Sequence, residues 1–184
     1  MRRDATERRE KLLDAAEMAF SNRGINVPLE EIAERAGVGA GTFYRNFRDR
    51  QALMDALLER SLDRMEQKMR EVPLSEAPLY LIEYIADCLV EGPVLSEYWR
   101  TEGKNTDTAN RGRERFMVIA DRGMREAVAS GLIRHDLSPA DFPLISGMLG
   151  AIMSGRDRAE RILIRERLLC LLYRGILSTD RLNP

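Results

Sequence analysis

The feature that most constrains this chain is a glycine-punctuated turn, Gly37–Gly41, between two short segments that have helical apolar spacing. Upstream, residues 29–36 carry apolar side chains on one helical face and charged side chains on the other. Downstream, Phe43 and Phe47 lie one turn apart and predict a second short helix that buries both rings. A long helix is expected after Asp49, a good N-cap residue. This order of elements is the helix-turn-helix pattern.

Helical periodicity extends beyond this element, and no segment shows the sustained two-residue alternation of a strand. A first helix is expected from about Thr6 to Arg23, after a mobile arm at residues 1–6. Five later helices are expected at Leu79–Gly92, Pro93–Arg100, Arg113–Ser130, Pro139–Ser154 and Arg156–Ser178, with a surface loop at Thr101–Gly112. The prediction is an all-α fold: a helix-turn-helix head at 1–50, a connecting fourth helix at 49–72 and a helical bundle at 73–184.

The composition is that of a globular protein with a real core, because 44% of the 184 residues are hydrophobic and 32% are charged. The formal net charge is -1, which argues against a protein that coats DNA through charge alone. No apolar run approaches the length of a membrane span, and the N-terminus lacks the pattern of a signal peptide. Cys88 and Cys170 are expected to be reduced thiols, so the expected location is the cytoplasm without membrane association.

The run IAERAGVGAGTFYRNFRDRQAL (Ile32–Leu53) resembles the signature of the TetR family of bacterial transcriptional regulators. The resemblance covers about residues 8–55, and its most specific part is AGV followed by GTFY. It implies a three-helix DNA-binding head and a larger helical domain that binds a small ligand and dimerises. Three residues depart from the family pattern and imply fewer phosphate contacts. Pro28 stands where Ser or Thr is frequent, Gly39 where Ser is common, and Asn46 where His is frequent.

The outward side chains of a recognition helix must be small or able to reach base edges in the major groove. Thr42, Tyr44 and Arg45 point away from the predicted core face. By the resemblance, Thr42 and Tyr44 bond phosphates, Arg45 reaches a base or a phosphate, and Arg50 matches a backbone-gripping lysine. Two alternatives stay open: Tyr44 packs on the surface of the head, and Arg48 is an ordinary solvated charge. The expected DNA-binding residues are Ala40, Gly41, Thr42, Tyr44, Arg45, Asn46, Arg48 and Arg50.

A ligand cavity in a helical bundle needs adaptable apolar side chains and a few polar tips, which methionine and aromatic residues supply. The same residue types at helical spacing also make an ordinary core. With that alternative open, we expect a small, largely apolar effector of unknown identity. Its expected lining is Tyr84, Cys88, Tyr98, Trp99, Phe116, Met117, Met124 and Met148.

The last two expected helices have the character of a dimer interface. The penultimate helix carries small residues that permit close approach of another helix. The last helix has apolar residues on more than one face, which indicates burial on several sides. The expected interface residues are Gly147, Gly150, Ala151, Leu168, Leu169, Leu172, Tyr173 and Ile176. A monomeric bundle is the alternative.

These features predict a homodimeric, ligand-responsive repressor that binds a palindromic double-stranded DNA operator. An activator, a ligand-independent repressor and an adaptor with a degenerate head are the alternatives. We expect no enzyme, catalytic residue or cofactor, because the sequence offers no nucleophile–base pair and no paired-carboxylate site. The lone histidine, His135, has no partners at ligand spacing, so no metal site is expected.

Overall fold

The computed structural model describes residues 2–92, 96 and 107–177. This part of the chain contains helices and no strand, and an isolated antiparallel bridge joins Ile133 to Leu177, so the all-α prediction is confirmed. None of the helices in it is long and apolar enough to span a lipid bilayer. The helical elements are α1 (Arg2–Arg23), α2 (Leu29–Arg35), α3 (Ala40–Asn46), α4 (Arg50–Arg70), α5 (Ala77–Glu91), α7 (Asp107–Asp121), α8 (Met124–Ala129), η2 (Pro139–Asp141), α9 (Phe142–Leu149), η3 (Gly150–Ser154) and α10 (Arg158–Ile176).

The chain forms two compact units, and their boundary falls inside α4. The first includes Met1–Ser61, here called the head, and the second includes Leu62–Pro93 and Arg111–Pro184, here called the bundle. Each is described by itself. The domain limits expected from the sequence, 1–50 and 73–184, remain predictions.

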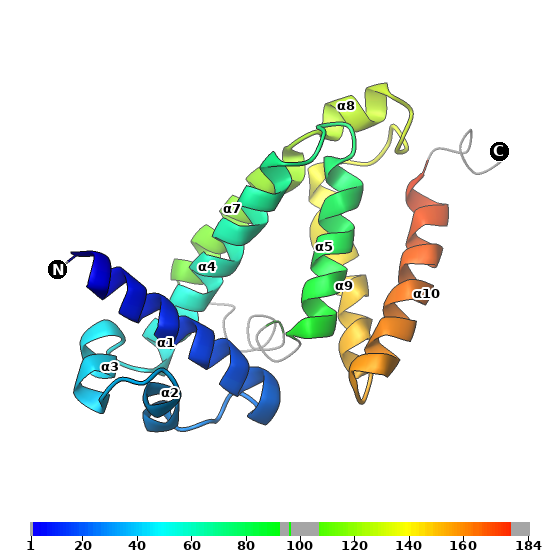
Figure 1. Ribbon diagram of the computed structural model, residues 1–184. Helices are drawn as coiled ribbons and strands as arrows, with labels where there is room; N and C mark the ends of the chain where they lie inside the picture. The colour runs from blue at the N-terminus through cyan, green and yellow to red at the C-terminus, as the bar shows by residue number, and fades with distance from the viewer. Residues whose placement is uncertain (1, 93–95, 97–106, 178–184) are drawn as a thin grey trace. The chain divides into compact units, whose positions relative to one another are not determined.

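The core of the head is an apolar cluster to which α1, α2, α3 and the start of α4 contribute (Figure 1). Phe20, Phe43 and Phe47 are at most 1% exposed within it. Gly37 adopts φ +68 directly after α2, which lets the chain reverse without strain before α3. The Asp49 carboxylate accepts the backbone N–H of Ala52 at 2.8 Å, the predicted cap of α4.

A buried cation ties α1 to α4 within the head. The Arg60 side chain is 9% exposed, and its guanidinium lies 2.7 Å from Asp14 Oδ1, 2.8 Å from Glu17 Oε1 and 3.4 Å from Glu10 Oε2. A buried guanidinium stays charged and is costly unless it is paired. The three carboxylates along α1 supply that pairing and join the two helices, while Arg60 Nε has no hydrogen-bond partner among the described residues.

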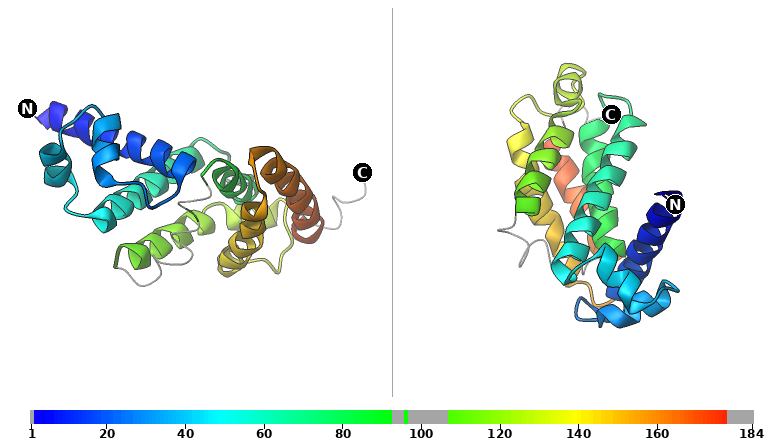
Figure 2. Two further views of the ribbon diagram at one scale, coloured as in Figure 1. Left: turned by 90° about the horizontal axis from the view of Figure 1, so that it is seen from below. Right: turned by 90° about the vertical axis from the view of Figure 1, so that its left-hand side faces the viewer.

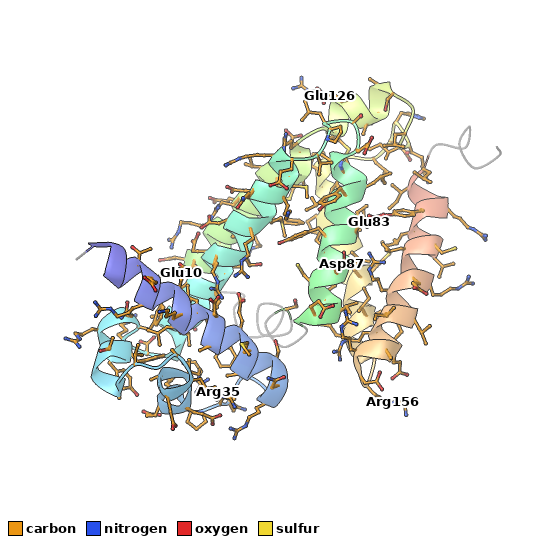
Figure 3. The ribbon with its side chains drawn as sticks, viewed as in Figure 1. Glu10, Arg35, Glu83, Asp87, Glu126 and Arg156 are labelled. Carbon is orange, nitrogen blue, oxygen red and sulfur yellow. The ribbon has the colours of Figure 1, made fainter. Side chains whose placement is uncertain are left out.

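In the bundle, α5, α9 and α10 lie side by side (Figures 1 and 2). Apolar side chains such as Leu81, Ile82 and Phe142 are at most 2% exposed there. Acidic residues of α5 point toward α10, as Figure 3 shows for Glu83 and Asp87. The seam between the two helices is bridged by three polar links: Tyr173 Oη to Glu83 at 2.5 Å, Arg165 Nε to Asp87 at 2.6 Å and Arg158 Nη2 to Glu91 at 2.5 Å.

Several helix boundaries expected from the sequence are wrong. The single helix Arg113–Ser130 is two helices, α7 and α8, broken at Gly123, where φ is +78. A Cβ at Gly123 would lie 1.9 Å from the Leu74 carbonyl oxygen, so the close approach of this distant backbone segment requires glycine at the break. The penultimate helix, Pro139–Ser154, is α-helical only between residues 142 and 149 and has 3-10 geometry at both ends.

Two segments expected to be irregular are helical. The first helix begins at Arg2 and not at Thr6, and ion pairs such as Glu7 Oε1 to Lys11 Nζ, at 2.9 Å, support its charged start. The expected loop at Thr101–Gly112 is helical from Asp107, an acidic residue that favours a helix start. The rest of that loop, and the expected helix Pro93–Arg100 except Ser96, lie outside the described residues.

Replacing Gly123 by alanine should destabilise the protein more than the same change at Gly131. Both glycines have positive φ, but an added Cβ at Gly131 meets nothing within 4 Å. The left-handed backbone alone costs about 1–2 kcal/mol in either variant. The clash with Leu74 adds about 1–3 kcal/mol for Gly123→Ala. Urea unfolding followed by circular dichroism measures both, and equal losses would contradict this account of the break.

Candidate nucleic-acid interface

Helix α3 buries one face and exposes the other. Phe43 and Phe47 are each 1% exposed, while Tyr44 on the opposite side is 44% exposed. Ala40, Gly41 and Arg45 are also exposed, and Thr42 is half-buried. A Cβ at Gly41 would meet nothing within 4 Å, so packing inside the head does not require glycine there. The exposed backbone at the start of α3 is therefore accessible to another molecule.

Three polar side chains of α3 bond within their own helix. Arg45 Nε donates to the Gly41 carbonyl at 3.1 Å, and Arg45 Nη2 donates to Thr42 Oγ1 at 3.0 Å. The Asn46 amide donates to the Thr42 carbonyl at 2.8 Å. These short-range bonds hold the side chains over the exposed face of α3, and an arginine arranged in this way remains able to exchange partners.

Tyr44 is linked to α2. Its hydroxyl donates to Glu30 Oε1 at 2.7 Å, and its ring meets Phe43 edge-on at 5.5 Å between centroids. This hydrogen bond holds the pKa of Glu30 below its usual range and raises the pKa of Tyr44, so the pair consists of a carboxylate and a neutral phenol. Sequence reasoning placed Glu30 on a charged outer face and did not identify this contact, because its two residues are 14 positions apart.

The two arginines beside α3 have different surroundings. The Arg48 side chain is 85% exposed, and its Nε lies 3.0 Å from Asp49 Oδ2. Arg50 instead donates to the carbonyls of Ile25 and Val27, the latter at 2.6 Å. Its guanidinium also lies over the Phe20 ring, 5.8 Å from the centroid. Arg50 thus fastens the turn between α1 and α2, a role that sequence reasoning missed.

A further cation lies at the end of α3. The Arg9 guanidinium lies 4.7 Å from the centroid of the Phe47 ring, and its Nη1 is buried without a hydrogen-bond partner in the described residues. The cation–π contact partly compensates its loss of water. No local pattern in the sequence signals this contact, since it depends on how α1 crosses the end of α3.

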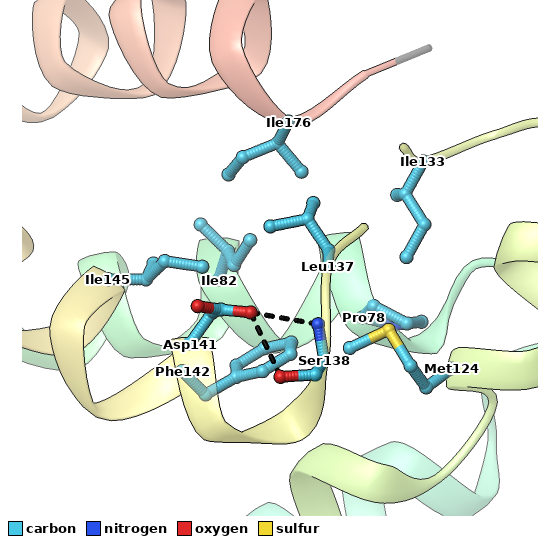
Figure 4. Close-up of a pocket in the computed structure, with 10 residues that line it drawn as sticks. All are labelled: Pro78, Ile82, Met124, Ile133, Leu137, Ser138, Asp141, Phe142, Ile145 and Ile176. Atoms are coloured by element: carbon cyan, nitrogen blue, oxygen red, sulfur yellow. Dashed lines mark hydrogen bonds between the residues drawn. The ribbon is translucent and has the colours of Figure 1, made fainter. Parts of the chain in front are cut away.

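The described residues of the bundle line a cavity of about 10 Å³ beneath α9. At this size it holds one water molecule at most. Asp141 Oδ2 accepts from the Ser138 backbone N–H at 2.8 Å and from Ser138 Oγ at 3.0 Å at the edge of the cavity (Figure 4). Met124 lines it, together with Pro78, Ile82, Ile133, Leu137, Phe142, Ile145 and Ile176.

The other expected effector-binding residues lie elsewhere. Tyr84 and Cys88 are half-buried neighbours on α5. Burial is the larger cause, and the adjacent Cys88 thiol the next, of a rise in the pKa of Tyr84 to about 12. Phe116 and Met117 are half-buried on α7, and Met148 is 49% exposed on α9. Tyr98 and Trp99 lie outside the described residues.

The outer face of α9 and α10 is apolar. Leu144 is 67% exposed, Met148 49% and Leu171 50%, and they border a surface groove of about 330 Å³. Of the expected interface residues, Gly147 and Ala151 are exposed, Gly150, Leu168, Leu172 and Tyr173 are half-buried, and Leu169 and Ile176 are buried inside the bundle.

Comparisons with known proteins are consistent with this arrangement. Residues 12–57 match the model for bacterial regulatory proteins of the TetR family. An HTH-type transcriptional regulator of Staphylococcus aureus is 38% identical over 64 residues, which are 34% of this chain and 35% of that protein. The chain thus matches only about a third of the length of the curated relatives.

Solved structures match over nearly the full length. The TetR transcriptional regulator SCO0520 from Streptomyces coelicolor is 30% identical with a TM-score of 0.69, over 93% of this chain and 99% of that one. The TetR transcription regulatory protein from Mycobacterium vanbaalenii is 26% identical with a TM-score of 0.71, over 96% of this chain and 99% of that one.

Replacing Arg50 by alanine should destabilise the head, because a hydrogen bond from a charged group to a part-buried carbonyl contributes about 1.5–3 kcal/mol. Arg48→Ala makes the same chemical change at a side chain that is 85% exposed, so a change within about 0.5 kcal/mol is expected. Thermal unfolding monitored by circular dichroism compares the two variants. Equal stabilities would contradict the fastening role of Arg50.

Proposed function

Because this chain belongs to the TetR family of bacterial regulatory proteins, we propose that it is a transcriptional repressor that binds a palindromic DNA operator as a homodimer and is released by a small molecule. The observation that carries the proposal is that α3 has one buried face and one exposed face. Phe43 and Phe47 are buried in the head, and the exposed face of α3 presents Thr42, Tyr44 and Arg45. A short helix with this arrangement is suited to the major groove.

The residues of the exposed face fit the two kinds of contact that a sequence reader makes. The hydroxyls of Thr42 and Tyr44 suit phosphate oxygens, and the Arg45 guanidinium suits the edge of a guanine or a phosphate. Arg48, which is 85% exposed, is a further phosphate ligand in this proposal. Ala40 and Gly41 permit close backbone approach, and Asn46 and Arg50 act mainly by holding α3 and the preceding turn.

The apolar face of α9 and α10 supports the dimer. Exposed Leu144, Met148 and Leu171 would be unusual on a protein that stays monomeric, and exposed Gly147 and Ala151 permit close helix approach. A dimer formed through this face would carry two heads, one for each half of a palindromic operator. Half-sites are then expected near one helical turn apart or a multiple, about 34–36 Å.

The effector proposal rests on side chains of the bundle. Half-buried Tyr84, Cys88, Phe116 and Met117 offer apolar surface with few polar tips, which suits a small, largely apolar molecule. Such a molecule would favour release by binding the DNA-incompetent arrangement of α4 more tightly. The shift in DNA affinity is limited by that difference in effector affinity.

DNA binding is tested with a mobility-shift assay on the DNA that flanks the protein's own gene, run across a salt series. Operator binding should fall steeply with salt, because phosphate contacts release counterions. Absence of a shift on flanking DNA and on duplexes selected from a random library would overturn the proposal.

Arg45→Ala should weaken operator binding by about tenfold or more, since one base contact of an arginine contributes about 1–3 kcal/mol. Arg174→Ala, at an exposed residue of α10, is the matched control and should change binding less than twofold. Fluorescence anisotropy with a labelled operator measures both. An equal loss in the two variants would show a general charge effect and exclude a specific contact of Arg45.

Leu144→Glu and Leu171→Glu should each convert the dimer to a monomer, because an interface cannot bury an unpaired carboxylate. Val118→Glu is the control, since Val118 is 73% exposed and belongs to α7, which contributes no residue to the groove of α9 and α10. Size-exclusion chromatography with light scattering gives the mass of each variant. A dimer that survives both leucine changes would place the interface elsewhere.

A further inference from the structure

The hydrogen bond between Tyr44 and Glu30 lies on the surface that the head is proposed to turn toward DNA. Both side chains are exposed, so neither the burial of Tyr44 nor that of Glu30 enforces the 2.7 Å contact. It joins the first turn of α2 to the exposed face of α3. Neighbouring Glu31 is differently placed, because it pairs with Arg23 at 2.5 Å and Arg35 at 3.1 Å on α1 and α2.

The chemistry of the hydroxyl makes this contact exclusive. A phenol has one proton to donate, and the non-bridging oxygens of a DNA phosphate only accept. Tyr44 therefore donates either to Glu30 or to a phosphate. A phosphate at Tyr44 would also lie close to the Glu30 carboxylate, and two like charges at that separation repel each other.

We propose that Glu30 restrains DNA binding by holding the Tyr44 hydroxyl in the free protein, so that the hydroxyl must be released before it contacts a phosphate. Glu30 is thus a positioning residue that acts through Tyr44. The inference rests on the proposed function. The restraint by Glu30 lowers the affinity of the protein for every DNA sequence. Stable binding is then limited to duplexes whose bases the protein also contacts.

The test is a double-mutant cycle measured by fluorescence anisotropy on a labelled duplex, from the flanking DNA or selected from a random library. Glu30→Gln keeps the shape of the side chain and removes its charge. It should tighten binding about three- to tenfold, whereas in a Tyr44→Phe background the same change should yield less than twofold. Glu34→Gln removes an exposed charge from the same helix and should alter binding less than twofold.

A second readout does not involve DNA. Tyr44 is one of five tyrosines, and the absorbance titration of tyrosine ionisation should show one residue ionising at lower pH in Glu30→Gln than in the wild type. The shift should be missing in the Tyr44→Phe background. Thermal unfolding checks that all variants retain the fold.

The outcomes separate the inference from the proposed function. Equal gains from Glu30→Gln and Glu34→Gln, or a gain that persists in full without the Tyr44 hydroxyl, would overturn the inference alone. Unchanged or weaker binding by Glu30→Gln would do the same while wild-type binding still supports a DNA-binding regulator. Failure of the wild type and of every variant to bind any duplex overturns both.

Discussion

The burial of Phe43 and Phe47 is the constraint on which the candidate interface depends. Each ring is 1% exposed, and burying a phenylalanine side chain is worth about 1.5–3 kcal/mol. Rotating α3 about its axis would expose both rings and lose that stabilisation. The orientation of α3 is therefore fixed by the core, and the side chains between and beside the two rings, Thr42, Tyr44 and Arg45, must face outward. The hydrophobic core of the head thus determines which face of α3 is exposed.

Polar pairing complements this core at the helix seams. Arg60 and its three carboxylate partners fix α1 against α4, and the Asp87–Arg165 pair joins α5 to α10. In the bundle this leaves an unusual distribution, because charged residues of α10 face its neighbour while Leu171 faces outward. A lone bundle gains little from that pattern. A second copy of the chain, as proposed, would give the outward leucines a partner.

Local signals allowed the head to be predicted from the sequence. The spacing of the two phenylalanines, the glycine after α2 and the Asp49 cap each act over a few residues, and the structure shows all three. The requirement for glycine at position 123 could not be predicted in this way, because the close approach of the Leu74 carbonyl is not visible in the local sequence. The same reason hid the bonds of Arg50 and of Glu30, which join residues 14 to 25 positions apart. The DNA, effector and dimer residues remain predictions, since they concern molecules outside the chain.

The interactions inside the head also set a limit on what DNA contacts can contribute. Thr42, Tyr44, Arg45 and Asn46 all form hydrogen bonds within the protein. A phosphate or base that takes over one of these groups replaces a hydrogen bond already present, so the net gain per contact is a difference between two similar energies. With a net charge of -1, the chain has little general attraction to DNA to add. Strong binding then requires many simultaneous contacts, and the proposed dimer on a palindrome would make twice as many as one head.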